Sequence, residues 1–143
     1  MFSNILVAAD GSMGSDHAVS AAAEIAAALG AKLTVCHVFH IPEQYRDDLV
    51  GPLRDFIRED GEKILAHAVE VAAELGIEAD SRLVDTGHPA EAIIKLAGEL
   101  GVGLIVLGAR GRSSDGSRKI GSVGSAIVAG AKASVMVVRR TGG

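Results

Sequence analysis

The chain has 143 residues, 48% of them hydrophobic and only 3% aromatic, and a formal net charge of −4 at pH 7. This length suits one domain spanning residues 1–143, and the acidic balance argues against general binding to nucleic acids, which requires a broad basic surface. No apolar run approaches the ~20 residues of a membrane span, and no basic leader precedes the first apolar run. These features predict a cytoplasmic protein without a membrane segment.

The apolar pattern predicts strands that alternate with helices. Short apolar runs followed by turn residues are typical of buried strands, and apolar positions three or four residues apart are typical of helices. We expect Ser15 to cap the first helix, Gly30 to end it and Gly61 to weaken the middle of the second. The expected elements are, in chain order, a strand at 4–9, a helix at 15–29, a strand at 32–39, a loop at 40–50, a helix from about 53 to 75, a strand at 78–84, a helix at 88–100, a strand at 104–107, a helix at 123–131 and a strand at 135–138.

This alternation predicts a doubly wound α/β domain with a parallel sheet and helices on both faces. Five strands favour the order 3-2-1-4-5. In that order the winding reverses between the first and fourth strands, and ligands bind there, beyond the carboxyl ends of the strands. We therefore expect Asp10, after the first strand, to lie across a crevice from Gly108, after the fourth.

The most informative segment is the glycine-rich loop between the fourth strand and the last helix. It contains Gly108 and Gly111, then nine residues, then Gly121 and Ser122. Glycines let backbone N–H groups approach an anion closely, and a helix N-terminus adds free donors and a favourable dipole. The loop therefore predicts an anion site, and a plain surface connection is the alternative. Its charged residues, which sum to +3, are Arg110, Arg112, Arg118, Lys119 and Asp115.

Other residues give weaker signals. Asp10 is either a ligand of a ribose or a metal-bound phosphate, or a turn aspartate that caps backbone amides; the crevice favours the functional interpretation. Cys36, in a strand-like run, is expected to be a buried, inert thiol. The five histidines lack metal-ligand spacing, so we expect structural roles for His37 and His67. Nothing argues for a hydrolytic triad, because no histidine lies near in sequence to act as a base for Ser113, Ser114, Ser117, Ser122 or Ser125.

At these positions the chain resembles the universal stress protein family over nearly its whole length. Residues 4–12 resemble the opening strand and turn, and residues 87–90 the start of the third helix. The glycine pattern Gly-x2-Gly-x9-Gly-Ser matches the nucleotide-binding motif of the ATP-binding members. The resemblance implies an ATP site, with Mg²⁺ carried by the nucleotide.

The resemblance also implies a role for each matched position. Asp10 would contact the ribose, the phosphates or the metal ion. The adenine would rest against Ala8, Ala9, Val38 and Leu107, and the ribose and phosphates against Gly108, Gly111, Gly121, Ser122 and Val123. Arg110 and Arg112, inside the loop, complete the predicted nucleotide-binding set. Gly124 stands where the family usually has a hydroxyl residue, and we expect Ser125 to compensate for it.

The favoured function is an ATP-binding regulatory protein of the stress response without dedicated catalysis. The alternatives are a nucleotide-independent dimeric interaction protein and a slow ATPase, for which no general base other than Asp10 is evident. Because aromatic residues are few, we expect backbone hydrogen bonds of the second strand, near Val38, to select ATP over GTP. The last strand, at a sheet edge and without proline or charge, predicts a homodimer through residues 135–138.

Overall fold

The computed structural model describes residues 1–39, 50–109 and 121–139. The described residues form a five-stranded sheet with the order β3-β2-β1-β4-β5, and every neighbouring pair is parallel. The predicted fold class and strand order are therefore confirmed. The elements are β1 (Asn4–Ala8), α1 (Met13–Leu29), β2 (Lys32–Phe39), α2 (Val50–Glu74), β3 (Asp80–Asp85), α3 (Pro89–Leu100), β4 (Leu104–Gly108), α4 (Ser122–Gly130) and β5 (Ser134–Val138).

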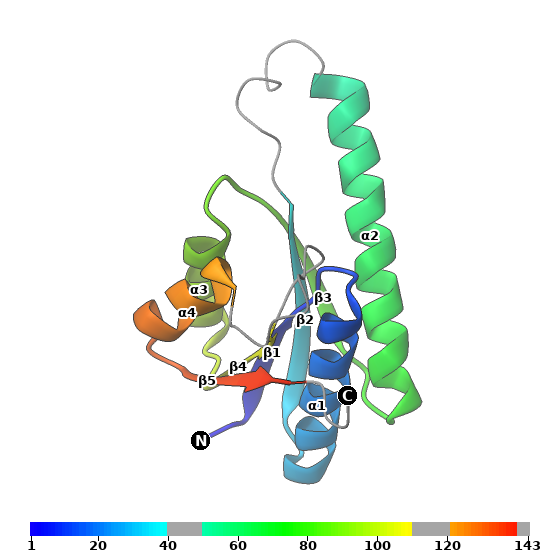
Figure 1. The fold of residues 1–143 in the computed structure, drawn as a ribbon. Coiled ribbons are helices and arrows are strands. Elements are labelled where there is room, and N and C mark those ends of the chain that lie inside the picture. Colours follow the sequence, from blue (N-terminus) through cyan, green and yellow to red (C-terminus); the bar gives the residue numbers. More distant parts are fainter. Residues whose placement is uncertain (40–49, 110–120, 140–143) are drawn as a thin grey trace.

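Two layers of helices enclose the sheet. Helices α1 and α2 cover one face and helices α3 and α4 cover the other (Figure 1). Fully buried Ala18, Ala22 and Ala26 line the inner side of α1, so this helix lies close to the strands. Larger side chains, among them Leu6 and Ile105, fill the core on the α3/α4 face. Burial of these apolar surfaces is the main stabilising contribution.

The start of α1 differs from the prediction. Ser12, and not Ser15, is the N-cap: its Oγ accepts a hydrogen bond from Ser15 N at 3.1 Å. Ser15 lies inside the first turn and donates its own hydroxyl to Ser12 O at 3.2 Å. The prediction of Ser15 as the cap was wrong because two serines three residues apart both satisfy the capping preference. The backbone decides between them, since Ser12 has the extended conformation of an N-cap.

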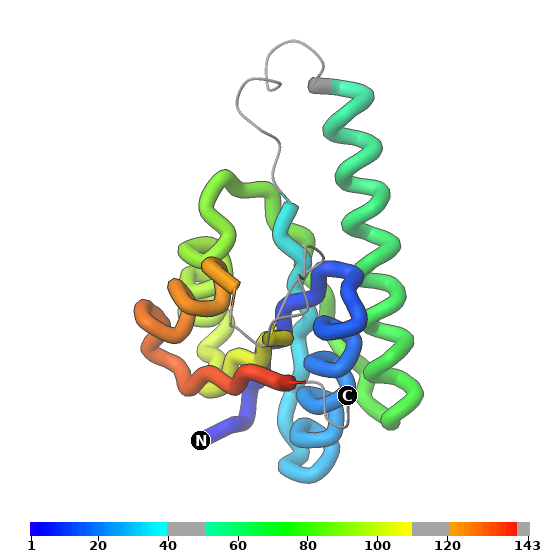
Figure 2. The backbone as a smooth tube through the Cα atoms, in the orientation of Figure 1, coloured from blue at the N-terminus to red at the C-terminus, as the bar shows by residue number. Residues whose placement is uncertain are grey.

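Helix α2 begins three residues before the expected position, at Val50, and continues through Gly61. The expected loop at 40–50 is wrong at its last residue, and residues 40–49 lie outside the described part of the chain. The tube in Figure 2 shows α2 (green) extending beyond the end of β2. The other boundaries agree with the predictions to within two residues.

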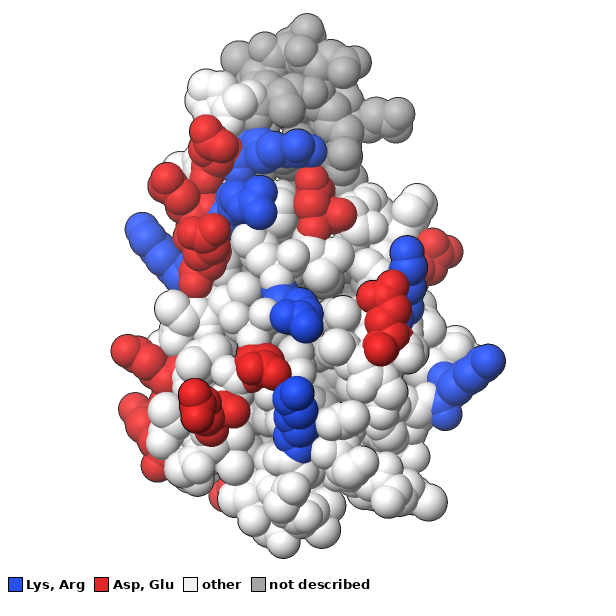
Figure 3. Space-filling view, turned by 180° about the vertical axis from the view of Figure 1, so that it is seen from behind, with Lys and Arg blue, Asp and Glu red and all other residues white. Residues whose placement is uncertain are grey.

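Charged side chains of both signs occupy the surface shown in Figure 3, where Lys and Arg alternate with Asp and Glu. Exposed ion pairs such as Arg58–Glu62, at 3.8 Å, and Lys32–Asp80, at 3.6 Å, belong to this kind of surface. Pairs of this exposure contribute little to stability. Among the described residues, no helix has the length and apolarity that crossing a membrane requires.

Candidate functional site

A pocket of about 400 Å³ opens beyond the carboxyl ends of β1 and β4, where the strand order reverses. This is the crevice that the strand order predicted. Asp10 and Gly108 both border it, as expected. Its lining within the described residues consists of Ala8, Ala9, Asp10, Ser15, Val38, Pro89, Ile93, Leu107, Gly108, Ala109, Gly121, Ser122, Val123 and Gly124.

The structure brings most of the predicted nucleotide-binding residues together in this pocket. Ser125 is exposed and is absent from the lining, and its N–H already donates to Gly121 O at 2.9 Å within α4. Arg110, Gly111 and Arg112 lie outside the described residues. The lining residues that sequence reasoning missed are Ser15, Pro89, Ile93, Ala109 and Gly124.

One side of the pocket is an aliphatic wall. Val38 is the second-last residue of β2, Leu107 lies in β4, and Ile93 belongs to α3. Leu107 and Ile93 are also buried in the core of the α3/α4 face. Ile93 follows the apolar spacing of a helix, and that pattern does not distinguish a core side chain from one that also lines a pocket. The wall suits a flat, weakly polar group.

Another part of the pocket lining is the N-terminus of α4. Gly121 is the N-cap and supplies no side chain to the helix, and the first intrahelical bond is donated by Ser125. The N–H groups of Ser122, Val123 and Gly124 therefore have no partner within the helix. These residues line the pocket, so free donors and the positive end of the helix dipole face it.

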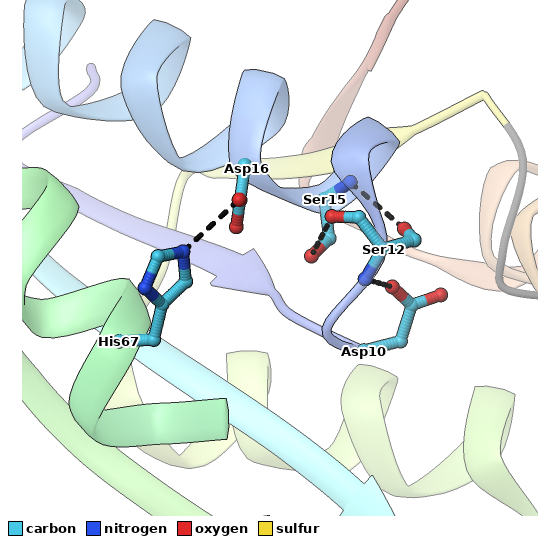
Figure 4. Close-up of polar contacts among 5 residues, drawn as sticks. All are labelled: Asp10, Ser12, Ser15, Asp16 and His67. Carbon is cyan, nitrogen blue, oxygen red and sulfur yellow. Dashed lines mark hydrogen bonds and ion pairs between the residues drawn. The ribbon is translucent and has the colours of Figure 1, made fainter. Parts of the chain in front are cut away.

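Asp10 occupies the corner where β1 turns into α1. Its Oδ1 accepts a hydrogen bond from Ser12 N at 2.9 Å (Figure 4). Within the described residues its Oδ2 has no hydrogen-bond partner, and Asp10 lines the pocket. Both interpretations of Asp10 therefore apply to the same side chain. One oxygen stabilises the turn, and the other is free to contact a ligand.

The backbone beside Asp10 is held by β2. Ala9 N donates to Cys36 O at 2.8 Å, and the Nδ1 of His37 donates to Ala9 O at 2.7 Å. The expected structural role of His37 is confirmed. Burial raises the pKa of the Cys36 thiol to about 12, so Cys36 is the buried, inert thiol that the sequence predicted.

Two motif glycines differ in what surrounds them. A Cβ on Gly108 would lie 2.7 Å from Gly14 O, so close packing of α1 on β4 requires glycine there. A Cβ on Gly121 would meet no atom of the described residues within 4 Å. The backbone angles of Gly121, φ −66° and ψ 170°, are accessible to any residue. The fold itself therefore does not explain the glycine at position 121.

The charged chemistry of the pocket is sparse. Asp10 is the only titratable side chain among its described lining residues. No three His, Cys, Asp or Glu side chains gather as a metal site within the part of the chain that the structure describes. A divalent cation would therefore need ligands from a bound molecule in addition to Asp10 Oδ2. Mg²⁺ is commonly held in this way, by one or two carboxylates together with phosphates.

Comparisons with known proteins agree with this geometry. The sequence profile of the universal stress protein family matches residues 1–139. Universal stress protein YxiE of Bacillus subtilis (strain 168) is 35% identical over 153 aligned positions, which cover 97% of this chain and all of YxiE. A universal stress protein solved in complex with cAMP is 30% identical, with a TM-score of 0.73 and coverage of 96% and 97% of the two chains. Hypothetical protein MJ0577 shares the fold, with a TM-score of 0.86 at 22% identity over 100% of this chain and 99% of its own.

Proposed function

The chain belongs to the universal stress protein family, and we propose that it binds adenine nucleotides, ATP first among them, as a stress-response regulator without dedicated catalysis. One observation carries this proposal. At the point where the strand order reverses, aliphatic side chains and the N-terminus of α4 line one and the same pocket. The relative in complex with cAMP supports the adenine class of ligand.

In this proposal the aliphatic wall and the start of α4 bind different parts of the nucleotide. The adenine rests on Val38 and Leu107, and the phosphates accept hydrogen bonds from the N–H groups at the start of α4. Asp10 Oδ2 contacts the ribose or the Mg²⁺ that accompanies ATP, and this cation neutralises part of the phosphate charge. Arg110, Gly111 and Arg112 remain proposed phosphate contacts, outside the described residues.

We propose that the nucleotide is bound as a signal and is not turned over efficiently. In the described lining of the pocket Asp10 is the only carboxylate; its Oδ1 accepts the Ser12 N–H, and its Oδ2 is the atom proposed to contact the ribose or Mg²⁺. A general base needs free access to the attacking water. An ATP-dependent role also fits a protein of the cytoplasm, where Mg²⁺ and ATP are abundant.

Titration calorimetry on the Gly121→Val variant tests the proposed site. The added Cβ meets no atom of the described residues within 4 Å, so the fold should persist, but the side chain would stand before the N–H groups at the start of α4. We expect micromolar ATP binding by the unmodified protein, weaker GTP binding, and a loss of about 100-fold or more in the variant. Gly98→Val is the matched control, because Gly98 is an exposed helical glycine with equally open surroundings.

Unchanged ATP affinity in a folded Gly121→Val protein would exclude the assigned phosphate site. Equal affinity for ATP and GTP would exclude base selection by the second strand. If the unmodified protein binds neither nucleotide and none is released from the denatured protein in mass spectrometry, the nucleotide-independent function is correct.

We further propose that the protein is a homodimer through β5. Ser134 N donates to Gly103 O, and Val138 O accepts from Ala109 N, so these residues direct their backbone groups toward β4. Since the direction alternates along a strand, Val135 and Val137 direct their N–H and C=O groups toward the open edge. The opposite edge strand, β3, contains Asp80, Arg82 and Asp85, and such charges discourage edge pairing.

Light scattering on the Val137→Pro variant tests this interface. Proline removes an outward-directed N–H and leaves the hydrogen bonds to β4 in place, so we expect a folded monomer. Ser81→Pro on β3 is the control and should remain dimeric, because Thr86 N donates to Phe39 O and alternation then directs Ser81 N outward. A dimeric Val137→Pro protein, or a monomeric unmodified protein at micromolar concentration, would place any interface elsewhere.

A further inference from the structure

We propose that His37 is a positioning residue for the nucleotide site, although it lies on the opposite face of the sheet, and that Gly61 of α2 provides the space for its ring. The proposal rests on the nucleotide-binding function proposed above. Val38 lines the pocket on the α3/α4 face, so its neighbour His37 projects toward α2. His37 is only 9% exposed and is not part of the pocket lining.

The hydrogen bond from His37 lies where β1 and β2 separate. Their paired register ends at Ala8 and Cys36, and Ala9 N donates the last bond to Cys36 O. A longer parallel ladder would use a backbone N–H of β2 for the carbonyl of Ala9. His37 Nδ1 occupies that role instead, at 2.7 Å from Ala9 O. Because a carbonyl oxygen only accepts, Nδ1 carries the proton.

This bond fixes the peptide group that joins Ala9 to Asp10. A peptide group is planar, so holding its carbonyl also fixes the direction of the Asp10 N–H and Cα. The carboxylate of Asp10 is then restrained from the other side by Ser12 N, at 2.9 Å. Both Ala9 and Asp10 line the pocket. His37 therefore sets the direction of the one described carboxylate in the pocket without touching the ligand.

Gly61 determines where the ring of His37 lies. A Cβ at this position would be 2.9 Å from Cδ2 of His37 and 2.8 Å from Cδ1 of Leu83. Gly61 is buried in the middle of a 25-residue helix, where glycine costs about 1 kcal/mol relative to alanine. The close approach of α2 to the His37 ring gives a physical reason for this unfavourable residue. This close approach also connects α2 to the pocket through Gly61, His37 and Ala9.

A pair of variants, His37→Asn and His37→Leu, separates the hydrogen bond from the loss of the ring. Asparagine places an amide nitrogen as many bonds from the backbone as Nδ1 of histidine, and leucine has the same branched shape without a donor. We expect ATP affinity, measured by calorimetry, to fall about tenfold in His37→Leu because Ala9 O loses its partner. His37→Asn should restore affinity to within about threefold of the unmodified protein.

Amide hydrogen exchange in the nucleotide-free protein gives a second readout. The Ser12 N–H reports directly on the position of the Asp10 carboxylate, to which it is bonded. We expect faster exchange at Ser12 in His37→Leu than in His37→Asn. A role limited to packing would change both variants equally, since both lose the ring.

The outcomes distinguish this inference from the proposed function. If the unmodified protein binds no adenine nucleotide, the proposed function fails, and the positioning role fails with it. If it binds ATP but His37→Leu binds equally well, or His37→Asn is as weak as His37→Leu, only the positioning role is overturned.

If His37→Leu does not fold, Gly61→Ala decides, since its Cβ displaces the ring from the α2 side while alanine favours the helix. Weaker ATP binding by a folded Gly61→Ala protein supports the connection, and unchanged affinity overturns it.

Discussion

Helices α1 and α4 both begin beside the pocket, yet their N-termini differ in capping. At α1, Ser12 caps the first turn, Asp10 accepts the Ser12 N–H, and Asp16 adds a negative charge. At α4, the N-cap is Gly121, no side chain of the described residues caps the helix, and the first turn contains no acidic residue. One helix start is capped by its own side chains, and the other has no side-chain cap from the described residues.

The difference predicts that the two helices contribute differently to stability and binding. A side-chain cap satisfies backbone donors in the folded protein itself and stabilises the helix by about 0.5–2 kcal/mol. An uncapped start forgoes that contribution until an anion arrives, and a ligand bound only by the folded state then stabilises it. We therefore expect substitutions at α1 to change stability and substitutions at α4 to change affinity.

The largest effect should follow from giving α4 the kind of cap that α1 has. In Gly121→Asp the new carboxylate would accept a hydrogen bond from the first turn of α4 and place a negative charge where phosphate is proposed to bind. We expect ATP affinity to fall by about 100-fold or more, while the free energy of unfolding rises by a few tenths of a kcal/mol. Calorimetry and urea unfolding measure the two quantities. A stable variant that still binds ATP tightly would show that the α4 start is not the phosphate site.

Part of the difference between the two helix starts could be predicted from the sequence. The positions of Asp10 and Gly108 on one crevice followed from the strand order, because parallel strands end at one edge of a sheet. The pocket-lining start of α4 followed from Gly121 and Ser122 after a buried strand. These predictions needed only topology and the conformational freedom of glycine.

Other parts of the site depend on contacts that no local pattern records. Ser12 and Ser15 have the same capping chemistry, and the choice depends on the turn that Asp10 stabilises. Ile93 is a helical apolar residue whether it faces a core or a pocket, so only the packed structure reveals its double role. Gly61 was expected to weaken its helix, and its contacts with β2 and β3 appear only in three dimensions.

A smaller effect should follow from removing the α1 cap. In Ser12→Ala the N–H of Ser15 loses its side-chain acceptor, whereas the bond from Ser12 N to Asp10 is retained because it is made by the backbone. We expect the free energy of unfolding to fall by about 1 kcal/mol and ATP affinity to change by less than about threefold. Ser20→Ala, inside α1 and outside the described lining of the pocket, is the control for both measurements. A large loss of affinity without a loss of stability would contradict the division between the two helices.

The smallest effect concerns the acidic residue in the first turn of α1. Asp16 Oδ2 lies 3.0 Å from Nε2 of His67 on α2 (Figure 4), as the structural role expected for His67 implies. The hydrogen bond to Asp16, followed by its charge, raises the pKa of His67 above 6.5. A pKa that is higher in the folded state than in the unfolded state adds stability at pH values below about 6.5, and this contribution disappears as the pH rises through the folded-state pKa. Both side chains are more than one third exposed, so solvent screening limits the pair to about 0.2–1 kcal/mol.

We expect His67→Gln to lower the free energy of unfolding at about pH 5.5 and to leave it unchanged at about pH 9. A double-mutant cycle that includes Asp16→Asn assigns the coupling to this pair. An equal loss of stability at both pH values would assign the role of His67 to packing. The ion pair with Asp16 would then not contribute to the stability of the start of α1.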